Sequence, residues 1–396
     1  MESIRITPGR RKGTVAVPPS KSHLHRLLIA DFLSGGHRFA DAGGVSEDVN
    51  ATCRCLSALY KASASGCSAL LDCGESGSTL RFLLPLATTM VDSAEFIASG
   101  RLPNRPVKPF LDILSAHGVV SQSGISFPLR LHGRLRHGEF RVRGDISSQI
   151  VSGLLLALPL LGGDSSIVCI TPLESRGYVD MTLGVMEDYG IVVSAVGDSF
   201  HIAGNQSYVA TDEFAPELDW SGAAFWLAMN SLGSDIDVPG LSMRSSQPDR
   251  KIAELLAFKG EATDVSQCPD SFPVLAVVAA ARPVETRFIG VKRLRLKESD
   301  RLASMAEVLS RLGVRTQIGE DFFIVHGVGP HFMGGASIDT YGDHRIAMAA
   351  AVAATIADAP VAIENPACAA KSYPDFFKQF ASLENLDKDY IGCFPQ

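Results

Sequence analysis

The sequence repeats one plan six times, and this repetition limits the possible folds more than any other feature. Each repeat has a short segment rich in Ser, Gly or Asp, followed by an Ala- or Leu-rich run typical of a helix. The runs begin at residues 20, 75, 145, 219, 269 and 342. Their nearly continuous apolar character predicts helices that are buried on most sides. The chain is therefore expected to consist of repeated units that pack against one another.

A second kind of helix, amphipathic and ended by glycine, lies between the apolar runs. In segment 299–316, Leu302, Met305 and Leu309 follow the 3.6-residue period, and Gly313 ends the helix. Similar segments lie at 106–120 and 178–193. Short β-branched runs follow these glycines. Each unit thus reads as strand, helix, strand, helix, strand, strand, and we expect six such units, three in each half.

The length of 396 residues predicts two domains. Polar and Pro residues separate two periodic regions at 211–222, and the first residues are expected to pair with the C-terminal half. We predict an N-terminal domain of residues 14–218 and a C-terminal domain of residues 1–13 plus 219–396. The tail after Leu383 has no periodicity and is left unassigned.

Charge and composition exclude several classes of protein. A net charge of −7 argues against general nucleic-acid binding, because no excess of cations is available for a phosphate backbone. The apolar runs are too short to span a membrane, and no secretory signal precedes them. We therefore expect a cytoplasmic protein. The eight cysteines show no C-x-x-C spacing, so neither a metal site nor a disulfide is expected.

Lysine and arginine residues recur at the starts of these helices or in the turns beside them. A helix N-terminus is already positive, so cations there are unfavourable unless an anion binds between them and the helix. A single one would be read as a solvated surface charge, but eight in repeated contexts favour a pocket for a small anionic substrate. Ser22 and Arg26, like Lys297 and Arg301, are spaced to share a helix face. The eight are Lys21, Arg26, Arg81, Arg105, Lys297, Arg301, Arg345 and Lys371.

Hydroxyl and amide groups accompany the cations. Simple N-capping explains one serine well but the run Ser-Ser-Gln poorly, whereas a phosphate or polyol at a helix start would use all three side chains. The groups are Ser22, Ser76, Ser78, Ser147, Ser148, Gln149 and Ser175.

Five residues are candidates for acid–base chemistry: Asp270, Glu298, Asp343, His344 and Lys371. Glu298 lies beside cations, so it is either an ion-paired structural residue or a proton carrier whose pKa those cations lower. His344 is either a neutral hydrogen-bond donor or a proton carrier. The residues alone leave these roles open.

Nine short stretches between Lys21 and Asp375 resemble, in order, the 5-enolpyruvylshikimate-3-phosphate synthase family. They read PPSKSHLHR, GESGSTLRF, LPNRP, SSQ, ESRGY, PD, LRLKESDR, GDHRIAM and KSYPDF. The resemblance implies an α/β fold of two domains, each of three βαβαββ units with buried parallel helices (an inside-out α/β barrel). It implies an active site in the cleft between the domains. The implied reaction transfers the enolpyruvyl group of phosphoenolpyruvate to the 5-hydroxyl of shikimate 3-phosphate, with neither cofactor nor metal.

The resemblance also implies ligand contacts and catalytic roles. Asp270 takes the 5-hydroxyl proton, with Lys21 as an alternative, and Glu298 delivers a proton to the methylene carbon, which leads to a tetrahedral ketal. His344 and Lys371 complete the implied catalytic set. The implied shikimate 3-phosphate ligands are Lys21, Ser22, Arg26, Ser147, Ser148, Gln149, Ser175, Tyr178, Asp270 and Lys297. The implied phosphoenolpyruvate ligands are Lys21, Gly77, Arg81, Arg105, Gln149, Arg301, His344, Arg345 and Lys371.

Some positions depart from the family pattern. Glu75 and Ser78 stand in a stretch that is usually Asn-Ala-Gly-Thr, and Arg293 replaces a frequent Asn. Gly77 keeps the glycine associated with a glyphosate-sensitive pocket. One alternative is the UDP-N-acetylglucosamine enolpyruvyl transferase, whose loop cysteine has no counterpart near Arg105. Another is a non-catalytic relative that binds anions or RNA ends. We expect a monomer.

Overall fold

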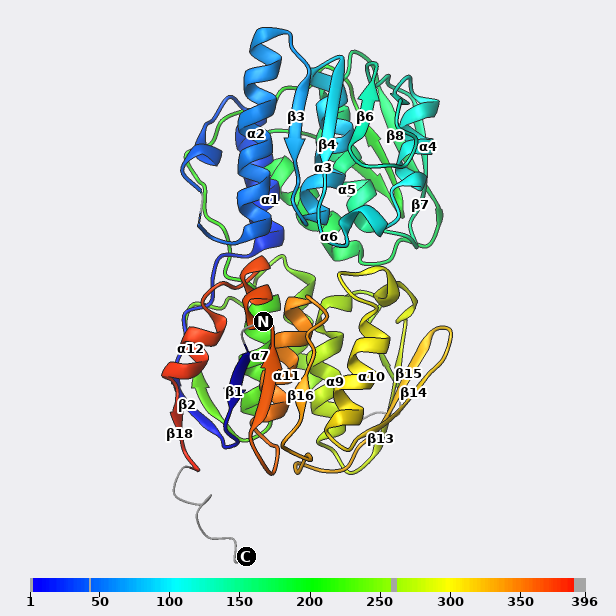
Figure 1. Cartoon of the computed structure of the whole chain (residues 1–396). Helices are drawn as coiled ribbons and strands as arrows, with labels where there is room; N and C mark the ends of the chain where they lie inside the picture. Colours follow the sequence, from blue (N-terminus) through cyan, green and yellow to red (C-terminus); the bar gives the residue numbers. More distant parts are fainter. Residues whose placement is uncertain (1–2, 43, 258–261, 388–396) are drawn as a thin grey trace, which may run out of the picture. The chain divides into compact units, whose positions relative to one another are not determined.

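The computed structural model describes residues 3–42, 44–257 and 262–387 (Figure 1). It divides the chain into two compact units, which we call the middle unit (residues 21–216) and the terminal unit (residues 1–20 with 217–396). Of the helices in the described ranges, none is long and apolar enough to cross a membrane. The resemblance also predicts that residues 14–218 bind mainly shikimate 3-phosphate and that residues 1–13 with 219–396 contact mainly phosphoenolpyruvate, which stays a prediction.

Three parts of the chain have the complete strand–helix–strand–helix–strand–strand order. The first runs through β3 (Ala69–Asp72), α3 (Gly77–Met90), β4 (Ser93–Ile97), α4 (Lys108–Ala116), β5 (Val120–Ser121) and β6 (Leu129–His132). The second runs through β7 (Glu139–Arg143), α5 (Ser148–Ala157), β8 (Ser165–Thr171), α6 (Arg176–Asp188), β9 (Val193–Val196) and β10 (Ser199–Ile202). The third runs through β12 (Ala262–Asp264), α9 (Phe272–Ala280), β13 (Glu285–Ile289), α10 (Arg301–Arg311), β14 (Arg315–Ile318) and β15 (Phe322–His326).

These three parts share one sheet topology. The first two strands pair in parallel across the first helix, the fourth strand pairs antiparallel with the second, and the third strand lies at the edge. The second part repeats this with β7, β8, β10 and β9. A parallel pair requires a crossover connection, which the first helix of each part provides. The repeat predicted from the sequence is therefore confirmed for these parts.

In the rest of the described residues, the elements depart from this chain order within the same fold class. The segment that opens the middle unit consists of α1 (Lys21–Leu33) and α2 (Glu47–Ser65), with no strand among its described residues. The 3.6-residue pattern of 47–65 leaves no room for a strand there, and the loop before it is rich in Gly and Asp. Figure 1 shows α2 as one long helix.

The terminal unit completes its sheets with strands from both ends of the chain. One sheet has the order β1 (Ser3–Ile6), β17 (Val361–Glu364), β16 (Ser337–Ile338). The other has the order β11 (Asp235–Asp237), β2 (Arg11–Thr14), β18 (Glu384–Asn385), so part of the unassigned tail forms a strand. The remaining helices are α7 (Trp220–Ser231), α8 (Ile252–Ala257), α11 (His344–Ala354) and α12 (Phe376–Ser382). Each sheet in the described residues keeps two edge strands, and none closes into a barrel.

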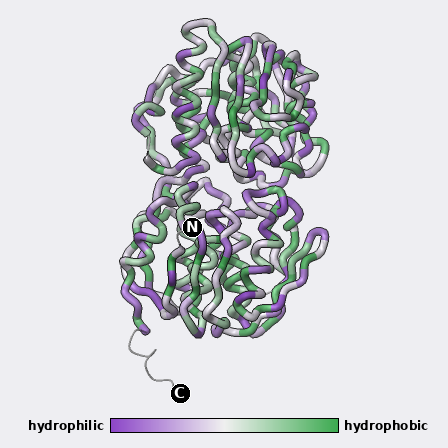
Figure 2. The backbone as a smooth tube through the Cα atoms, in the orientation of Figure 1, coloured by the Kyte–Doolittle hydropathy of each residue, from purple (hydrophilic) through white to green (hydrophobic). Residues whose placement is uncertain are grey.

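The six apolar runs form α1, α3, α5, α7, α9 and α11, which confirms them as buried helices. Every residue of α9 and α11 is buried, and the tube in Figure 2 is green along such internal segments. Helices α3 and α5 pack side by side. Gly153 permits this contact, because a Cβ there would lie 2.4 Å from the carbonyl oxygen of Arg81. The absence of a side chain at Gly153 thus places the start of α5 beside a predicted substrate ligand.

Candidate active site

In the middle unit, Lys21 begins α1 and is paired with an acid of the next helix. Its Nζ lies 2.8 Å from Oδ2 of Asp48, in the first turn of α2. Only 14% of the Lys21 side chain and 6% of the Asp48 side chain are exposed. Sequence reasoning missed Asp48, because an acid in the first turn is by itself an ordinary helix-start signal. The pair fixes the Lys21 ammonium at the helix starts.

Two guanidinium groups converge on the start of α3. A Cβ placed on Gly77 would lie 2.6 Å from Nη1 of Arg81 and 2.6 Å from Nη1 of Arg105. Ser76 caps the helix by accepting a hydrogen bond from the backbone N–H of Thr79 at 3.2 Å. Glycine leaves room for both guanidinium groups, which a side chain at this position would displace. Sequence reasoning placed all three residues in one site, and the structure brings them together.

Gln149 connects α5 to this cation pair. Its Nε2 donates to Oγ of Ser78 at 2.9 Å, and its Oε1 accepts from Nη1 of Arg81 at 3.2 Å. Ser147 caps α5 by accepting from the backbone N–H of Gln149, so the simple capping role holds for this serine. Ser148 is the first residue of α5 and is buried. The Ser-Ser-Gln run therefore combines a cap with a side-chain bridge to Arg81.

Arg26 lies deeper, with its guanidinium bonded inside the unit. It donates to Oγ1 of Thr182 at 2.7 Å and to the carbonyl oxygens of Tyr178 and Ser22. Its side chain stacks over Phe82, and burial lowers its pKa to about 10. Arg26 thus contacts the backbone of Ser22 and Tyr178, while binding of shikimate 3-phosphate by these three residues stays a prediction.

Ser175 stands just before α6 in the left-handed conformation, with φ of 56°. Its side chain makes no capping hydrogen bond to α6 and is buried. A non-glycine residue in this region of φ is uncommon and typical of constrained functional positions.

In the terminal unit, the candidate acids surround one buried arginine. The guanidinium of Arg301 donates from Nη1 to Oδ1 of Asp270 at 2.7 Å and from Nη2 to Oε2 of Glu298 at 2.9 Å. Its Nε donates to Oδ2 of Asp343 at 2.9 Å. Only 1% of the Arg301 side chain is exposed. Burial lowers its pKa, but the three carboxylates outweigh that effect and raise the pKa above the usual arginine value. All three acids come from different segments.

Asp270 contacts two further cations. Lys297 Nζ lies 3.2 Å from its Oδ1, and Arg345 Nη2 lies 3.2 Å from its Oδ2. Burial alone would raise the pKa of this carboxyl group. The cations, with Arg345 contributing most, hold the pKa well below the usual aspartate value. The group is therefore a carboxylate near neutral pH.

The predicted shared helix face of Lys297 and Arg301 was wrong. Lys297 lies outside the helix, in extended backbone after a 3-10 turn, and α10 begins at Arg301. Asp300 caps α10, so the helix starts four residues after Lys297, which the spacing had placed on it. Lys297 and Arg301 nevertheless meet at Asp270, and burial lowers the pKa of Lys297. Arg293, the departure noted above, donates to the carbonyl oxygen of Ser266 at 2.9 Å.

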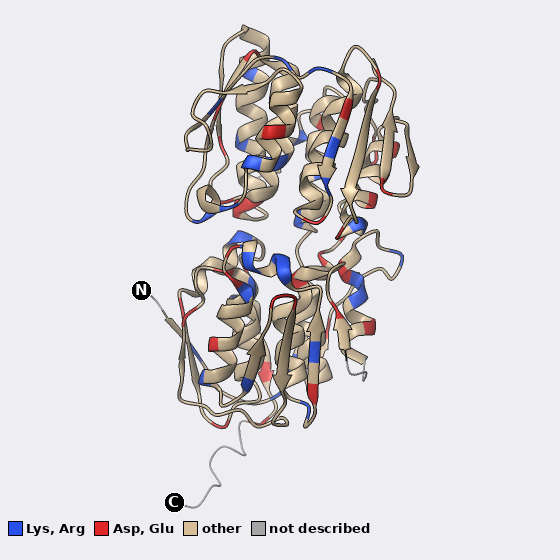
Figure 3. Cartoon of the chain, turned by 90° about the vertical axis from the view of Figure 1, so that its right-hand side faces the viewer, with Lys and Arg blue, Asp and Glu red and all other residues tan. Residues whose placement is uncertain are grey.

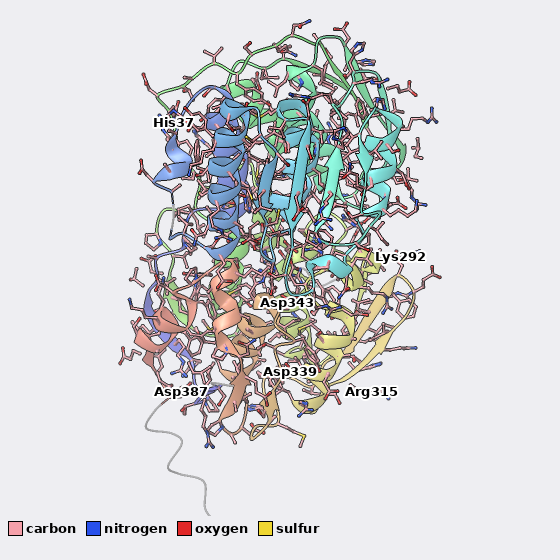
Figure 4. All side chains as sticks on the ribbon, turned by 45° about the horizontal axis from the view of Figure 1, so that its top comes forward. His37, Lys292, Arg315, Asp339, Asp343 and Asp387 are labelled. Carbon is pink, nitrogen blue, oxygen red and sulfur yellow. The ribbon has the colours of Figure 1, made fainter. Side chains whose placement is uncertain are left out.

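Asp343, labelled in Figure 4, is the buried cap of α11. It accepts from the backbone N–H of Arg345 at 2.9 Å and from Oγ of Ser299 at 3.0 Å, besides Arg301. His344 follows it, 1% exposed, with Nδ1 3.7 Å from Asp343 Oδ1. Asp343 therefore anchors cations and is committed to hydrogen bonds, a role that sequence reasoning did not assign.

Lys371 and Glu75 are two further positions that the sequence singled out, one buried and the other exposed. Lys371 ends the 3-10 turn Pro366–Lys371 in the terminal unit and is 5% exposed. Glu75 is exposed, and its carboxylate covers Gly100, where a Cβ would lie 2.1 Å from Glu75 Oε1. Figure 3 shows basic and acidic residues together at helix ends within each unit. Among the described residues, no cluster of His, Cys, Asp and Glu fits a metal ion.

Comparison with known proteins gives one consistent result. Residues 6–257 and 252–380 match the family described as EPSP synthase (3-phosphoshikimate 1-carboxyvinyltransferase). A 3-phosphoshikimate 1-carboxyvinyltransferase of Clostridium kluyveri is 39% identical over 99% of this chain and 100% of that protein. The one of Clostridioides difficile is 36% identical over 97% of this chain and 98% of that protein.

Solved structures show the same fold. An EPSP synthase from Acinetobacter baumannii superposes with a TM-score of 0.74 at 22% identity, over 97% of this chain and 99% of that one. An enolpyruvyl transferase from Streptomyces tendae superposes with a TM-score of 0.71 at 16% identity, over 96% of each chain. At these identities the likeness establishes the fold, which confirms the predicted fold class.

Proposed function

Because this chain belongs to the EPSP synthase (3-phosphoshikimate 1-carboxyvinyltransferase) family, we propose that its two polar clusters bind the two substrates of that reaction. The chain is a transferase of aromatic amino acid biosynthesis. It moves the enolpyruvyl group of phosphoenolpyruvate to the 5-hydroxyl of shikimate 3-phosphate and releases phosphate. The roles of individual residues below are our proposal.

Shikimate 3-phosphate binds mainly to the middle unit. Lys21, held by Asp48, presents its ammonium to the phosphate, while Ser22 and the Ser147–Gln149 run supply hydroxyl and amide groups. The buried Arg26 cluster supports this binding surface, with Tyr178 and Ser175 at the start of α6. Helix N-termini and charge-assisted hydrogen bonds both favour a phosphate at such a place. The family resemblance assigns Asp270 and Lys297 to the same ligand.

Phosphoenolpyruvate binds to the converging cations. Arg81 and Arg105 lie against Gly77, and this close approach supports a carboxylate or phosphate at their guanidinium groups. Gln149, bonded to Arg81, orients that arginine. Lys21, Arg301, His344, Arg345 and Lys371 complete the set and neutralise the second highly charged ligand. By holding the two anionic substrates together in the reactive orientation, these residues contribute much of the rate enhancement.

Proton transfers fall to the carboxylates around Arg301. Glu298 delivers a proton to the methylene carbon of phosphoenolpyruvate, which leaves C2 cationic. The 5-hydroxyl oxygen attacks C2, and its proton passes to the carboxylate of Asp270, or to the amine of Lys21 once that group has given up a proton of its own, giving the tetrahedral ketal. The C2–O bond to phosphate then breaks as the Glu298 carboxylate takes a proton back from the methyl carbon, and the enol ether and inorganic phosphate remain. Lys371 and His344 assist these transfers.

One observation carries the assignment of roles: Arg301 holds Asp270 and Glu298 on adjacent nitrogens of one guanidinium. The depressed pKa of Asp270 keeps it ionised, as a proton acceptor requires. The test is phosphate release from phosphoenolpyruvate with and without shikimate 3-phosphate, for wild type and Glu298→Gln. Release that depends on shikimate 3-phosphate and collapses in the variant supports the roles. Release that requires a UDP-sugar, or no release at all, contradicts them.

Further expectations belong to the same proposal. The enzyme works in the cytoplasm, as a monomer, without cofactor or metal, and is a target of glyphosate through the pocket at Gly77. A sedimentation run at assay concentration tests the monomer, and inhibition that competes with phosphoenolpyruvate tests glyphosate binding.

A further inference from the structure

We propose that a buried chain of four side chains, His25, Thr52, Thr79 and Ser76, positions the substrate-binding starts of α1, α2 and α3. Thr52 and Thr79 are then positioning residues for Lys21, Gly77 and Arg81. This inference rests on the proposed function of those three residues. None of the four chain members contacts a substrate in the roles assigned above.

The chain crosses three helices through short contacts. Nδ1 of His25 on α1 lies 2.8 Å from Oγ1 of Thr52 on α2. Oγ1 of Thr52 lies 2.7 Å from Oγ1 of Thr79 on α3, which donates to Oγ of Ser76 at 2.7 Å. All four residues are fully buried, each 0% exposed. Buried polar groups of this kind rigidify a site when they are all satisfied.

The direction of the hydrogen bonds follows from counting hydrogens. Thr79 has one hydroxyl hydrogen and two possible acceptors, Oγ of Ser76 at 2.7 Å and the carbonyl oxygen of Asp48 at 3.3 Å. The shorter contact to Ser76 takes this hydrogen, so Thr79 accepts from Thr52. Thr52 therefore donates its hydroxyl hydrogen to Thr79. Its oxygen accepts a hydrogen bond from His25, which must carry its proton on Nδ1. Nε2 of His25 has no hydrogen-bond partner among the described residues. A bare Nε2 lone pair costs less there than an unpaired buried N–H. Burial lowers the pKa of His25 to about 3, so the imidazole is neutral.

The chain ends at the groups that the proposed site uses. Ser76 also caps α3, directly before Gly77. Thr79 makes a second, longer contact of 3.3 Å to the carbonyl oxygen of Asp48, the residue that pairs with Lys21. A shift of Thr52 or Thr79 therefore moves the Lys21 anchor and the Gly77 turn together.

The test compares Thr52→Val with a matched control on the same helix bundle. Thr52→Val keeps the shape and removes the hydroxyl. Thr88→Val makes the same change at a buried threonine of α3 whose hydroxyl bonds to the carbonyl oxygens of Pro85 and Leu84 in its own helix. We expect the KM for phosphoenolpyruvate to rise about tenfold in Thr52→Val, which corresponds to about 1.4 kcal/mol. Thr88→Val should stay within about twofold, and Thr52→Ser should restore the wild-type value.

A spectroscopic measurement separates positioning from simple loss of stability. The imidazole ¹⁵N shifts of wild type, with the His25 signal assigned by its loss in His25→Gln, should show a proton on Nδ1. In Thr52→Val this proton loses its acceptor and the ¹⁵N signals should move. If Thr52→Val does not fold, Thr52→Ala takes its place in both measurements.

Several outcomes would overturn the inference. A proton on Nε2 in wild type contradicts the hydrogen-bond direction, and equal KM values for Thr52→Val and Thr88→Val contradict the positioning role. Wild type without phosphate release that depends on shikimate 3-phosphate means that the proposed function is wrong, and the positioning role is overturned with it. In that case the imidazole ¹⁵N shifts still test whether His25, Thr52, Thr79 and Ser76 are hydrogen-bonded to one another as described.

Discussion

Arg301 Nη1 lies 2.7 Å from Asp270 Oδ1, and this contact joins the most buried cation of the proposed site to its proposed base. The same guanidinium reaches Glu298 and Asp343. Because Asp343 is 0% exposed, Arg301 neutralises a charge that water does not reach. The arginine is thus as much a structural residue as a substrate ligand.

Replacing Arg301 should therefore cost stability as well as activity. Arg301→Met leaves the buried Asp343 carboxylate without its main cation, and we expect the free energy of unfolding to fall by about 3–5 kcal/mol. The control is Arg311→Met on the same helix, whose exposed pair with Glu307 contributes about 1 kcal/mol or less. Urea denaturation measures both. Equal losses in the two variants would show that Arg301 does not carry the buried charge.

Acid should weaken the protein partly through Asp270. Its folded pKa lies well below the usual value of 3.8, so its ion pairs stabilise the fold at higher pH. That contribution is lost as the pH falls from about 5, through 3.8, toward the folded pKa. We expect Tm of wild type to drop between pH 5 and pH 3, each about one unit from that value, and to drop less in Asp270→Asn. Identical slopes for the two proteins would contradict the depressed pKa.

Asp270→Asn should also be a poor catalyst. Loss of a positioned base costs about 10²- to 10⁴-fold in rate, so kcat should fall by that order while the protein stays folded. Stopped-assay phosphate release gives kcat, and circular dichroism confirms folding. A kcat within about threefold of wild type would show that Asp270 is not the base, and Lys21 would be the next candidate.

Gly77→Ala should weaken the binding of phosphoenolpyruvate. The new methyl group would lie 2.6 Å from Nη1 of both Arg81 and Arg105, so both must move. We expect KM for phosphoenolpyruvate to rise about tenfold, with a smaller change for shikimate 3-phosphate. Gly184→Ala in α6 is the control, because its Cβ meets nothing within 4 Å. That variant should keep its KM values and gain up to about 1 kcal/mol in helix stability.

Glu75→Gln should improve phosphoenolpyruvate binding. The carboxylate stands immediately before the cap of α3, where a bound anion would meet a like charge. Removing that charge should lower KM about threefold at low salt, with the difference shrinking as salt rises. Glu187→Gln, exposed at the end of α6, should change nothing. A raised KM in Glu75→Gln would mean that the carboxylate helps to hold Arg81 or Arg105 in place.

The apolar helices were predicted correctly from the sequence, because a helix that is apolar on all faces must be buried on all sides. The run 344–354 is apolar on every face, and all of it is buried. Sequence reasoning failed at 21–66, where two helices follow one another without a strand. It also placed Lys297 on a helix, because spacing alone cannot tell that Asp300 caps α10.

The site residues likewise divide into those that were predicted from the sequence and those that were missed. Gly77, Arg81 and Gln149 were assigned together by the family resemblance, and each stands at the start of an apolar helix. Asp48 and Thr52 were missed, because their partners lie 27 residues away in the chain. Their contacts depend on the packing of α2 against α1, which no local pattern encodes.

The central strand β2 has a consequence for how the protein is made. Residues 11–14 lie between β11 and β18, so one neighbour comes from residues 235–237 and the other from 384–385. During synthesis, β1 and β2 leave the ribosome before their partner strands. They therefore stay unpaired while the whole middle unit is synthesised and folds. Deleting residues 3–14 would remove the middle of one sheet and the edge of another. The terminal unit is therefore the last part to form, and it needs residues 3–14 to complete its two sheets.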